Sequence, residues 1–392
     1  MTEQIPFNEY IQLLKNGILR PLCKIEWLRP DESVQSSIAI LPLTSSSLTA
    51  DASSASVRRS VSLVLDNSNK DFLPSTDNLW IGAKFQMYLG YQDNQDREIY
   101  FPQGVFVLFD SDPSIISAYS SQTVNIVAQD KWCLLDIPIG HIYTVPSGNK
   151  ITDVIPTILK LVGDNMPPIM ENLDDIAPFD LIFAESSTYG EMLRSLANLY
   201  SRECYYDTTG HFILKSFVTQ DTSETIYDLT TDDSTYLGST LQLKYSQVFN
   251  HIYVTGASQN SNIAYFGEAV NDDLTSNSRR QLIGDKPMAV INDAKLNSND
   301  LCQQRADHEL QLAKRVQQNI SINSIAIYNI DVNKAITVSD DAIGLFKKRF
   351  IIQQYNLQLD AKSPMTITGF LFNDGIDFDD RLTMSSQNTT GS

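Results

Sequence analysis

Two stretches near opposite ends of the chain alternate apolar and polar residues, the pattern of strands with one buried face. In SVSLVLDNSN, residues 60–69, Val61, Leu63 and Leu65 point to one side of the predicted strand. In RFIIQQYNLQLD, residues 349–360, apolar residues are again spaced along an extended segment: Phe350, Ile352, Tyr355, Leu357 and Leu359. The pattern therefore predicts a β-rich block at each end of the chain.

The first β-rich block is predicted from about residue 19 to residue 135. It contains several short alternating runs separated by turn residues, which is typical of an antiparallel sheet or barrel. In one of these runs, KFQMYLGY, the side chains of Phe85, Met87 and Leu89 share a side. The segment LTSSSLTADASSAS, residues 43–56, predicts a long polar loop inside the block.

The period of the pattern changes between residues 136 and 240, where helices are predicted. In STYGEMLRSLANLYSRE, Thr188 and Glu191 have the spacing of a capping box, which marks the start of a helix. The segment CYYDTTGHFILKSF that follows predicts a hairpin around a turn ending at Gly210. A helix followed by a hairpin predicts a small α+β domain.

A second β-rich block begins at residue 241, and it contains a polar region, 257–297, and a helix, 298–318, with Ser298 as its expected cap. The predicted fold class is a β-rich, multidomain α+β protein, in which an antiparallel sheet or barrel and a second block that looks like a β-barrel flank a small α+β domain. The expected parts are an N-terminal helical segment at 1–18, a first β-rich domain at 19–135, the α+β domain at 136–240, a second β-rich domain at 241–375 and a partly disordered tail at 376–392.

The charge balance argues against some kinds of binding partner, namely nucleic acid and anionic membranes. The chain has 47 acidic and 29 basic residues, a net charge of −18. Stable binding to nucleic acid needs clustered Lys and Arg, but the longest basic runs are short: Arg58-Arg59, Arg279-Arg280 and Lys347-Lys348-Arg349. The same balance disfavours direct anchoring to an anionic membrane surface, and no apolar stretch approaches the roughly 20 residues of a membrane span.

The cysteines and the N-terminus indicate the compartment of synthesis. The four cysteines lie far apart and lack CxxC spacing: Cys23, Cys133, Cys204 and Cys302. They predict neither a disulfide scaffold nor a cysteine zinc site, and they suit a reducing cytoplasm. The N-terminus MTEQIPFNEY lacks the basic and apolar regions of a signal peptide. We therefore expect synthesis in the cytoplasm.

The sequence contains no recognisable catalytic constellation. The four histidines are scattered and are expected to have ordinary structural roles: His141, His211, His251 and His308. The acidic pairs lack calcium-loop spacing and are expected to be solvated charges: Asp174-Asp175, Asp232-Asp233, Asp272-Asp273, Asp340-Asp341 and Asp379-Asp380. Because phosphate-loop, nucleophile-elbow and dinucleotide motifs are also missing, we expect no enzyme activity, no cofactor and no metal.

The order of the predicted elements resembles that of baseplate hub, or tail-tip, proteins of long-tailed bacteriophages. The segments SVSLVLDN, GAKFQMYLGY, FPQGVFVLFD and TVNIVAQDKWCLLD are similar to the first tube-forming domain of that family. The matching positions are Asn67, Trp80, Gly82, Gly90, Gly104, Val105, Phe106, Asp130 and Leu134. The predicted helix and hairpin resemble the family's middle domain. The segments NHIYVTG, RADHELQLAKR, DVNKAITV, FIIQQYNLQL and PMTITG resemble its second tube-like domain, so the resemblance covers roughly residues 19–372.

This resemblance implies a structural protein of the virion, located in the tail baseplate after assembly in the host cytoplasm. Three chains of such a hub each contribute two similar tube-type barrels to a ring. The resulting homotrimer has six-fold pseudosymmetry and joins a six-fold tail tube to a three-fold spike or tail tip. The implied partners are two further copies of the chain, the tail tube or distal tail protein, the spike or tail-tip protein, the tape-measure protein and baseplate wedge or peripheral proteins. DNA would pass through the lumen during ejection without stable binding.

Eight strand residues are candidates for either barrel core or ring interface: Val61, Leu63, Leu65, Phe85, Met87, Leu89, Ile352 and Leu357. The excess of acids also suggests a hypothesis about the lumen, in which acidic side chains line the wall and repel phosphate. The competing possibility is that these acids lie in loops on the outer surface.

An alternative function is a carbohydrate-binding or carbohydrate-degrading protein of the virion or cell surface, because acidic, Tyr-rich β domains suit sugars. A degrading enzyme of this kind needs two carboxylates that face one cleft. A surface adhesin is a third possibility, which the N-terminus disfavours. A tailocin or an injection system would use the same hub as a phage.

Overall fold

The computed structural model describes most of the chain, in the following ranges: 3–40, 45–54, 56–73, 79–109, 112–118, 121–171, 174–200, 202–216, 225–243, 248–257, 264–274, 276, 278–293, 296–313, 318–359 and 365–371. The described residues fall into two compact units. Unit 1 is drawn from Met1–Thr240 and Ile320–Gly369, and unit 2 from Leu241–Asn319 and Phe370–Ser392. Residues Asp379-Asp380 and the predicted tail lie outside the described ranges.

Unit 1 is built on a sheet of 14 strands, most of them antiparallel. The first eight strands come from the N-terminal β block: β1 (Arg20–Leu28), β2 (Val34–Ala39), β3 (Ser47–Asp51), β4 (Arg59–Asp66), β5 (Lys84–Gln92), β6 (Glu98–Val107), β7 (Ser114–Ala118) and β8 (Ser121–Asp130). The other six come from later in the chain: β14 (Thr225–Thr230), β15 (Tyr236–Leu243), β19 (Gln318–Ser324), β20 (Ala335–Asp340), β21 (Leu345–Gln358) and β22 (Met365–Leu371). One sheet therefore contains strands from both β-rich blocks.

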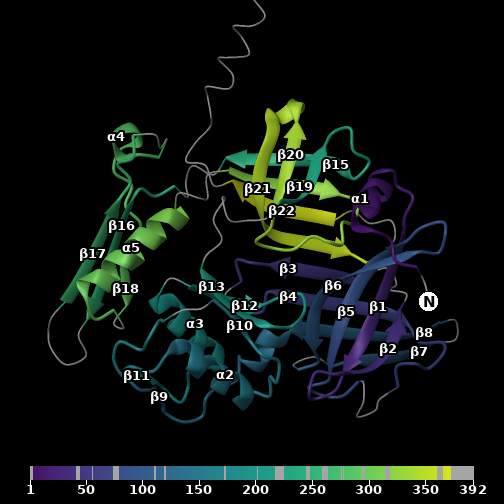
Figure 1. Ribbon diagram of the computed structural model, residues 1–392, viewed down its shortest axis with the longest axis horizontal. Coiled ribbons are helices and arrows are strands. Elements are labelled where there is room, and N and C mark those ends of the chain that lie inside the picture. Colours follow the sequence, from purple (N-terminus) through teal and green to yellow (C-terminus); the bar gives the residue numbers. More distant parts are fainter. Residues whose placement is uncertain are drawn as a thin grey trace, which may run out of the picture. The chain divides into compact units, whose positions relative to one another are not determined.

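The strand order of the main path is β15-β19-β22-β21-β3-β4-β8-β6-β5-β1-β2. Figure 1 shows β19, β22, β21, β3 and β4 side by side. Off this path, β7 pairs with β8, and β20 pairs with β21 and in parallel with β14. Helix α1 (Phe7–Lys15) packs through Tyr10, whose ring lies 5.0 Å from that of Phe101.

The predicted polar loop at 43–56 is wrong at its centre, where strand β3 forms. Leu48 and Ala50 are fully buried, and Ser47 and Thr49, which alternate with them, face the other side of the sheet. Strand β3 pairs antiparallel with β21 on one side and β4 on the other. Because both edges of this short strand are paired, its backbone polar groups are satisfied although its composition is that of a loop.

The α+β part of unit 1 follows strand β8. Its elements are the 3-10 helix η1 (Lys131–Leu134), β9 (Tyr143–Val145), α2 (Ile151–Leu161), β10 (Ile169–Met170), β11 (Leu181–Phe183), α3 (Tyr189–Leu199), β12 (Arg202–Tyr206) and β13 (Phe212–Ser216). The predicted capping box is confirmed, since the Thr188 hydroxyl accepts from Glu191 N and the Glu191 carboxylate accepts from Thr188 N. The hairpin is confirmed too, because β12 and β13 pair antiparallel around Gly210, whose φ is +85°.

Helices α2 and α3 cover one hydrophobic core of this α+β part. The buried apolar side chains include Ile155 and Ile158 from α2 and Met192, Leu193 and Leu196 from α3. Trp132 of η1 also belongs to this cluster, with its ring 6.3 Å from that of Phe212. Pro156 lies inside α2 and does not end the helix.

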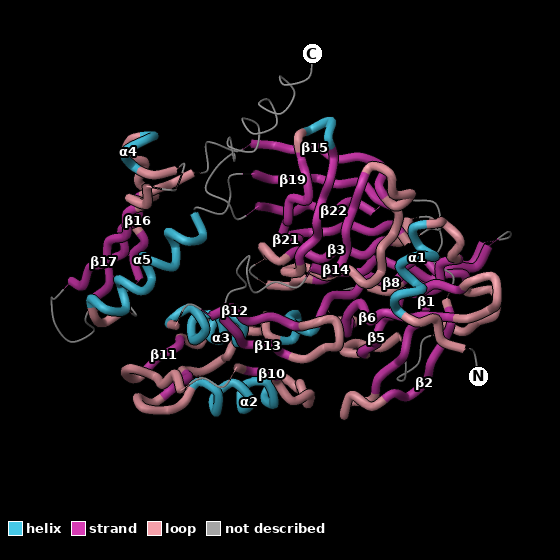
Figure 2. The backbone as a smooth tube through the Cα atoms, turned by 45° about the horizontal axis from the view of Figure 1, so that its top comes forward, coloured by secondary structure: helices cyan, strands magenta, loops and turns pink. Residues whose placement is uncertain are grey.

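Unit 2 is a small α/β body. Its elements are β16 (His251–Ala257), β17 (Ala264–Val270), α4 (Arg280–Ile283), β18 (Ile291–Asp293) and α5 (Asn299–Ala313). Figure 2 shows α5 running along β16 and β17. The Ser298 hydroxyl accepts from Leu301 N, which confirms the predicted cap, and Cys302, Ala306 and Leu310 of α5 are buried against the strands. The end of the predicted helix, residues 314–317, lies outside the described residues, and Gln318 begins strand β19.

The β-rich character and the large antiparallel sheets agree with the predicted fold class. At this level the chain is one extended sheet with an attached α+β part, together with a second compact unit.

Candidate assembly site

The large sheet contains a path of eight strands whose two end strands are each paired on one side only, among the described residues. The order is β7-β8-β4-β3-β21-β22-β19-β15. Among the described residues, β7 pairs only with β8 and β15 pairs only with β19. Within the same described ranges, strands β2 and β14, which lie off this path, also have one paired side each. Unpaired edges expose backbone N–H and C=O groups that can bind a further strand.

Strand β7 is the most exposed of these edges. All five of its residues are exposed, including the apolar side chains of Ile115 and Ile116. It carries none of the charged residues that commonly protect an edge strand from pairing. The strand is therefore suited to contact with another chain.

The eight candidate residues from the sequence lie in the interior of the single chain. Each is at most 2% exposed: Val61, Leu63, Leu65, Phe85, Met87, Leu89, Ile352 and Leu357. The sequence alone could not distinguish core from interface for these positions. Their side chains are covered by the chain's own residues, so a role for these strands in ring contacts stays a prediction that concerns their edges and their opposite face.

A buried ionic cluster fastens the α+β part to the sheet. Lys131 Nζ, which is fully buried, donates to Asp164 Oδ1 at 2.5 Å and lies 3.1 Å from Glu32 Oε1. The Tyr206 hydroxyl donates to the second oxygen of Asp164 at 2.8 Å, and burial raises the pKa of that hydroxyl. Charges removed from water in this way need complementary partners, so the cluster specifies one packing of these segments.

A second buried contact links strand β4 to the C-terminal β block. The Arg59 guanidinium is fully buried and donates to Asp331 Oδ1 at 2.5 Å and to the Tyr206 carbonyl oxygen at 2.6 Å. The neighbouring Arg58 donates to Glu203 at 3.1 Å. The sequence showed the Arg58-Arg59 pair only as a short basic run, because its partners lie more than a hundred residues away.

The structure explains the residue types at two positions that carry the family resemblance, Asp130 and Gly104. The Asp130 carboxylate accepts from the backbone N–H groups of Arg58, Arg59 and Trp132 and caps helix η1, while burial raises its pKa. Gly104 has φ +149° beside a bulge in the β5–β6 pair, a backbone conformation that favours glycine. Both positions therefore serve the fold.

The described histidines and acidic pairs are dispersed. His141 and His211 each contact a backbone carbonyl. The acids of four pairs contact the chain's own groups: Asp174 with Lys150, Asp175 with Arg202, Asp233 with Lys15, Asp272 with Arg280, and Asp340 with the Tyr236 hydroxyl. Within the described ranges, no three His, Cys, Asp or Glu side chains are grouped to hold a metal ion.

His251 is a residue whose setting the sequence did not predict. Its Nδ1 lies 2.8 Å from Asp285 Oδ1, and its Nε2 lies 2.7 Å from Glu268 Oε1. The ring is buried and lies 4.2 Å from that of Tyr253. This arrangement holds the segment after α4 against strands β16 and β17 of unit 2.

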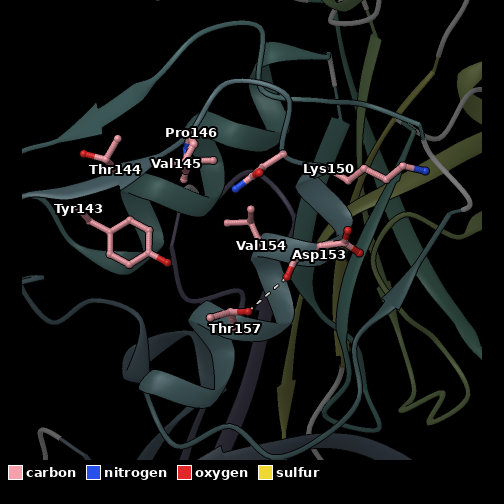
Figure 3. A pocket seen from close by; sticks show the side chains of 9 residues that line it. Tyr143, Thr144, Val145, Pro146, Lys150, Asp153, Val154 and Thr157 are labelled. Carbon is pink, nitrogen blue, oxygen red and sulfur yellow. Dashed lines mark hydrogen bonds between the residues drawn. The ribbon is translucent and has the colours of Figure 1, made fainter.

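A pocket of about 290 Å³ lies between strand β9 and the first turns of helix α2 (Figure 3). Its lining residues are Tyr143, Thr144, Val145, Pro146, Asn149, Lys150, Asp153, Val154 and Thr157. Asp153 is the single carboxylate in this lining, whereas glycoside hydrolysis needs a pair. The pocket therefore gives no support to a carbohydrate-degrading function. In the part of the chain that the structure describes, no helix has the length and apolar composition needed to span a membrane.

Several solved structures of other proteins share this architecture. No family model matches the sequence, and no curated protein matches it. Among solved structures, the 43 kDa tail protein of prophage MuSo2 from Shewanella oneidensis is 13% identical with a TM-score of 0.62, covering 90% of this chain and 99% of that one. A tail protein from Neisseria meningitidis is 9% identical with a TM-score of 0.63, covering 89% and 96%.

A prophage tail protein from Listeria monocytogenes is 12% identical with a TM-score of 0.53, covering 94% of this chain and all of that one. The chain therefore shares the fold of phage tail proteins over nearly its whole length. This likeness confirms, at the level of the fold, the resemblance to tail hub proteins seen in the sequence.

Proposed function

We propose that this chain is a non-enzymatic structural protein of a phage tail, the hub of its baseplate. Three copies form a ring that joins the six-fold tail tube to a three-fold spike or tail tip, with DNA passing through the centre. The observation that carries the proposal is the eight-strand path with its two unpaired ends, β7 and β15, on a chain with the fold of tail proteins.

The two halves of the path come from the two β-rich blocks. Strands β3, β4, β8 and β7 belong to the first block, and β19, β22 and β21 belong to the second. Strand β15 spans the predicted start of the second block at residue 241 and pairs with β19. Within one chain the blocks join where β21 pairs with β3. An equivalent junction between chains would pair β15 of one copy with β7 of the next, so each copy supplies two similar four-strand segments.

The dimensions of such a ring suit the function. Three copies of eight strands give 24 strands, which at about 4.8 Å per strand form a wall roughly 115 Å around and about 37 Å across between backbones. Side chains narrow this opening and leave room for a double helix. The tail tube, the spike and the tape-measure protein are the partners that this position in the virion implies.

The test is the mass of the purified protein in solution, measured by light scattering, for the wild type and two variants. The variant Ile115→Lys/Ile116→Lys places charges on edge β7, and the control Ile142→Lys/Ile182→Lys places the same charges near the exposed β9–β11 sheet. We expect a trimer for the wild type and the control, and a monomer for the β7 variant. A wild-type monomer, or equal effects of both variants, would count against the proposed ring.

A further inference from the structure

Where β8, β4, β3 and the end of β21 lie side by side, the open face of the eight-strand path carries little charge. In this region, which includes residues 354–358 of β21, its residues alternate with the buried ones and are half-buried or exposed. On the four strands at its centre they are Ser47, Thr49 and Asp51 of β3, Ser60, Ser62, Val64 and Asp66 of β4, Thr123, Asn125, Val127 and Gln129 of β8, and Gln354, Asn356 and Gln358 of β21. Ser, Thr, Asn and Gln dominate this face.

The strand register shows that these side chains form continuous rows. Thr49 lies opposite Asn356 on one side and Ser60 on the other, and Ser60 lies opposite Gln129. A parallel row runs from Gln358 through Ser47 and Ser62 to Val127. The pattern extends to β22 and β19, where the Thr366 hydroxyl donates to Asn323 at 3.2 Å.

The two acids on this face lie at its margin. Asp51 ends strand β3 and accepts from the backbone and hydroxyl of Ser53. Asp66 ends strand β4 and makes the same two contacts with Ser68. Both carboxylates therefore cap turns, and no Lys or Arg occurs among the residues named for these four strands. The basic run Lys347-Lys348-Arg349 lies outside these rows, in the part of β21 that pairs with β20. In a chain of which 19% is charged, this face is unusual.

The composition of this face argues against two ordinary explanations, a permanent protein interface and a general solvent-exposed surface. A face covered permanently by a protein partner would be largely apolar at its centre, and this one is hydroxyl- and amide-rich. A face in contact with water normally carries Lys, Glu, Asp and Arg, and this one does not. The remaining explanation is a wetted surface past which a highly charged polymer moves without binding.

We infer that this uncharged sheet face is the wall of the DNA channel, and that DNA passes because the wall offers no charge to bind it. This inference rests on the proposed ring and names the chemistry of its lumen. Without Lys or Arg, the wall displaces no counterions from DNA, which removes the main source of non-specific affinity. The acidic-lumen hypothesis raised by the overall charge is therefore replaced, for this face, by a neutral polar wall.

The experiment compares linear and covalently closed circular double-stranded DNA, which differ in whether a ring can be threaded onto them. The test variant, Ser62→Arg/Asn125→Arg/Asn356→Arg, places arginines on three strands of the face. The matched control, Ile142→Arg/Thr144→Arg/Ile182→Arg, places three arginines at exposed positions around the β9–β11 sheet. The single variant Asn356→Arg serves if the triple variant does not fold. Oligomeric state is measured in parallel by light scattering.

We expect the wild type to bind neither DNA at 50 or 200 mM salt. The face variant should bind linear DNA at 50 mM salt, and its affinity should be at least tenfold lower at 200 mM salt. It should bind closed circles poorly, because they have no end to thread. The control should bind both DNA forms equally. Two results would overturn the inference about the wall and leave the proposed ring unaffected. They are a trimeric face variant that binds circles and linear DNA equally, and a trimeric wild type that binds DNA. A monomeric wild type would overturn the proposed ring as well.

Discussion

Leu48 of strand β3 lies directly opposite Leu357 of strand β21, and both side chains are buried. These two residues come from the two β-rich blocks at opposite ends of the chain. Their pairing makes one sheet of the two blocks, so a five-residue strand in a Ser/Thr-rich segment determines whether the path of eight strands is continuous.

Replacing the Leu48 side chain should destabilise the sheet. We expect Leu48→Ala to lower the free energy of unfolding by about 2–5 kcal/mol, because it leaves a cavity among buried apolar residues. The matched control is Thr49→Ala, on the opposite face of the same strand, which should cost less than about 1 kcal/mol. Urea denaturation followed by fluorescence measures both. Equal losses for the two variants would show that β3 is not packed as described.

The buried cluster around Lys131 gives a second prediction. We expect Lys131→Met to lower the free energy of unfolding by about 3–5 kcal/mol, because it leaves the buried carboxylate of Asp164 without its cation. The double variant Lys131→Met/Asp164→Asn removes that uncompensated charge and should recover part of the loss. Additive losses in this double-mutant cycle would mean that the two side chains do not interact in solution.

The ion pair between Glu9 of helix α1 and Arg97 should stabilise the folded chain less in acid. The hydrogen bond from Arg97 lowers the pKa of Glu9, so the ionised carboxylate stabilises the folded chain. Since the folded pKa is lower than the unfolded value, this contribution is present above the usual pKa of 4.5 and is lost as the pH falls through the folded pKa.

The matched variant is Glu9→Gln. Its free energy of unfolding should lie below that of the wild type at pH 7, and the two values should converge as the pH falls below about 4.5, near the ordinary pKa of a glutamate. Denaturation curves collected from pH 3 to pH 7 provide the measurement. A difference that stays constant across this range would rule out Glu9 ionisation as its source.

Local signals in the sequence were sufficient for several elements. The Thr188–Glu191 capping box and the Gly210 hairpin depend on residues within a few positions of one another, and both form as predicted. Alternation likewise identified strands β4 and β5, because their buried residues are large and apolar.

The features that the sequence did not reveal depend on partners that lie far away along the chain. Strand β3 has only Leu48 and Ala50 as buried residues, so its composition resembles a loop, and its pairing partner β21 lies near the other end of the chain. Arg59 is buried because Asp331 and the Tyr206 carbonyl surround it. The neutral face was also hidden, since it appears only when the rows of several strands are aligned.

The most direct test of the central claim is a cross-link between the two edges that the ring is proposed to join. The variant Ser117→Cys/Thr240→Cys places one thiol on β7 and one on β15. Background reaction should be low, because burial raises the pKa of all four native thiols. After oxidation we predict a covalent trimer of three times 43.9 kDa on a non-reducing gel, which returns to monomer on reduction. A protein that stays monomeric on that gel, in this variant and in neighbouring β7–β15 cysteine pairs, would contradict the account.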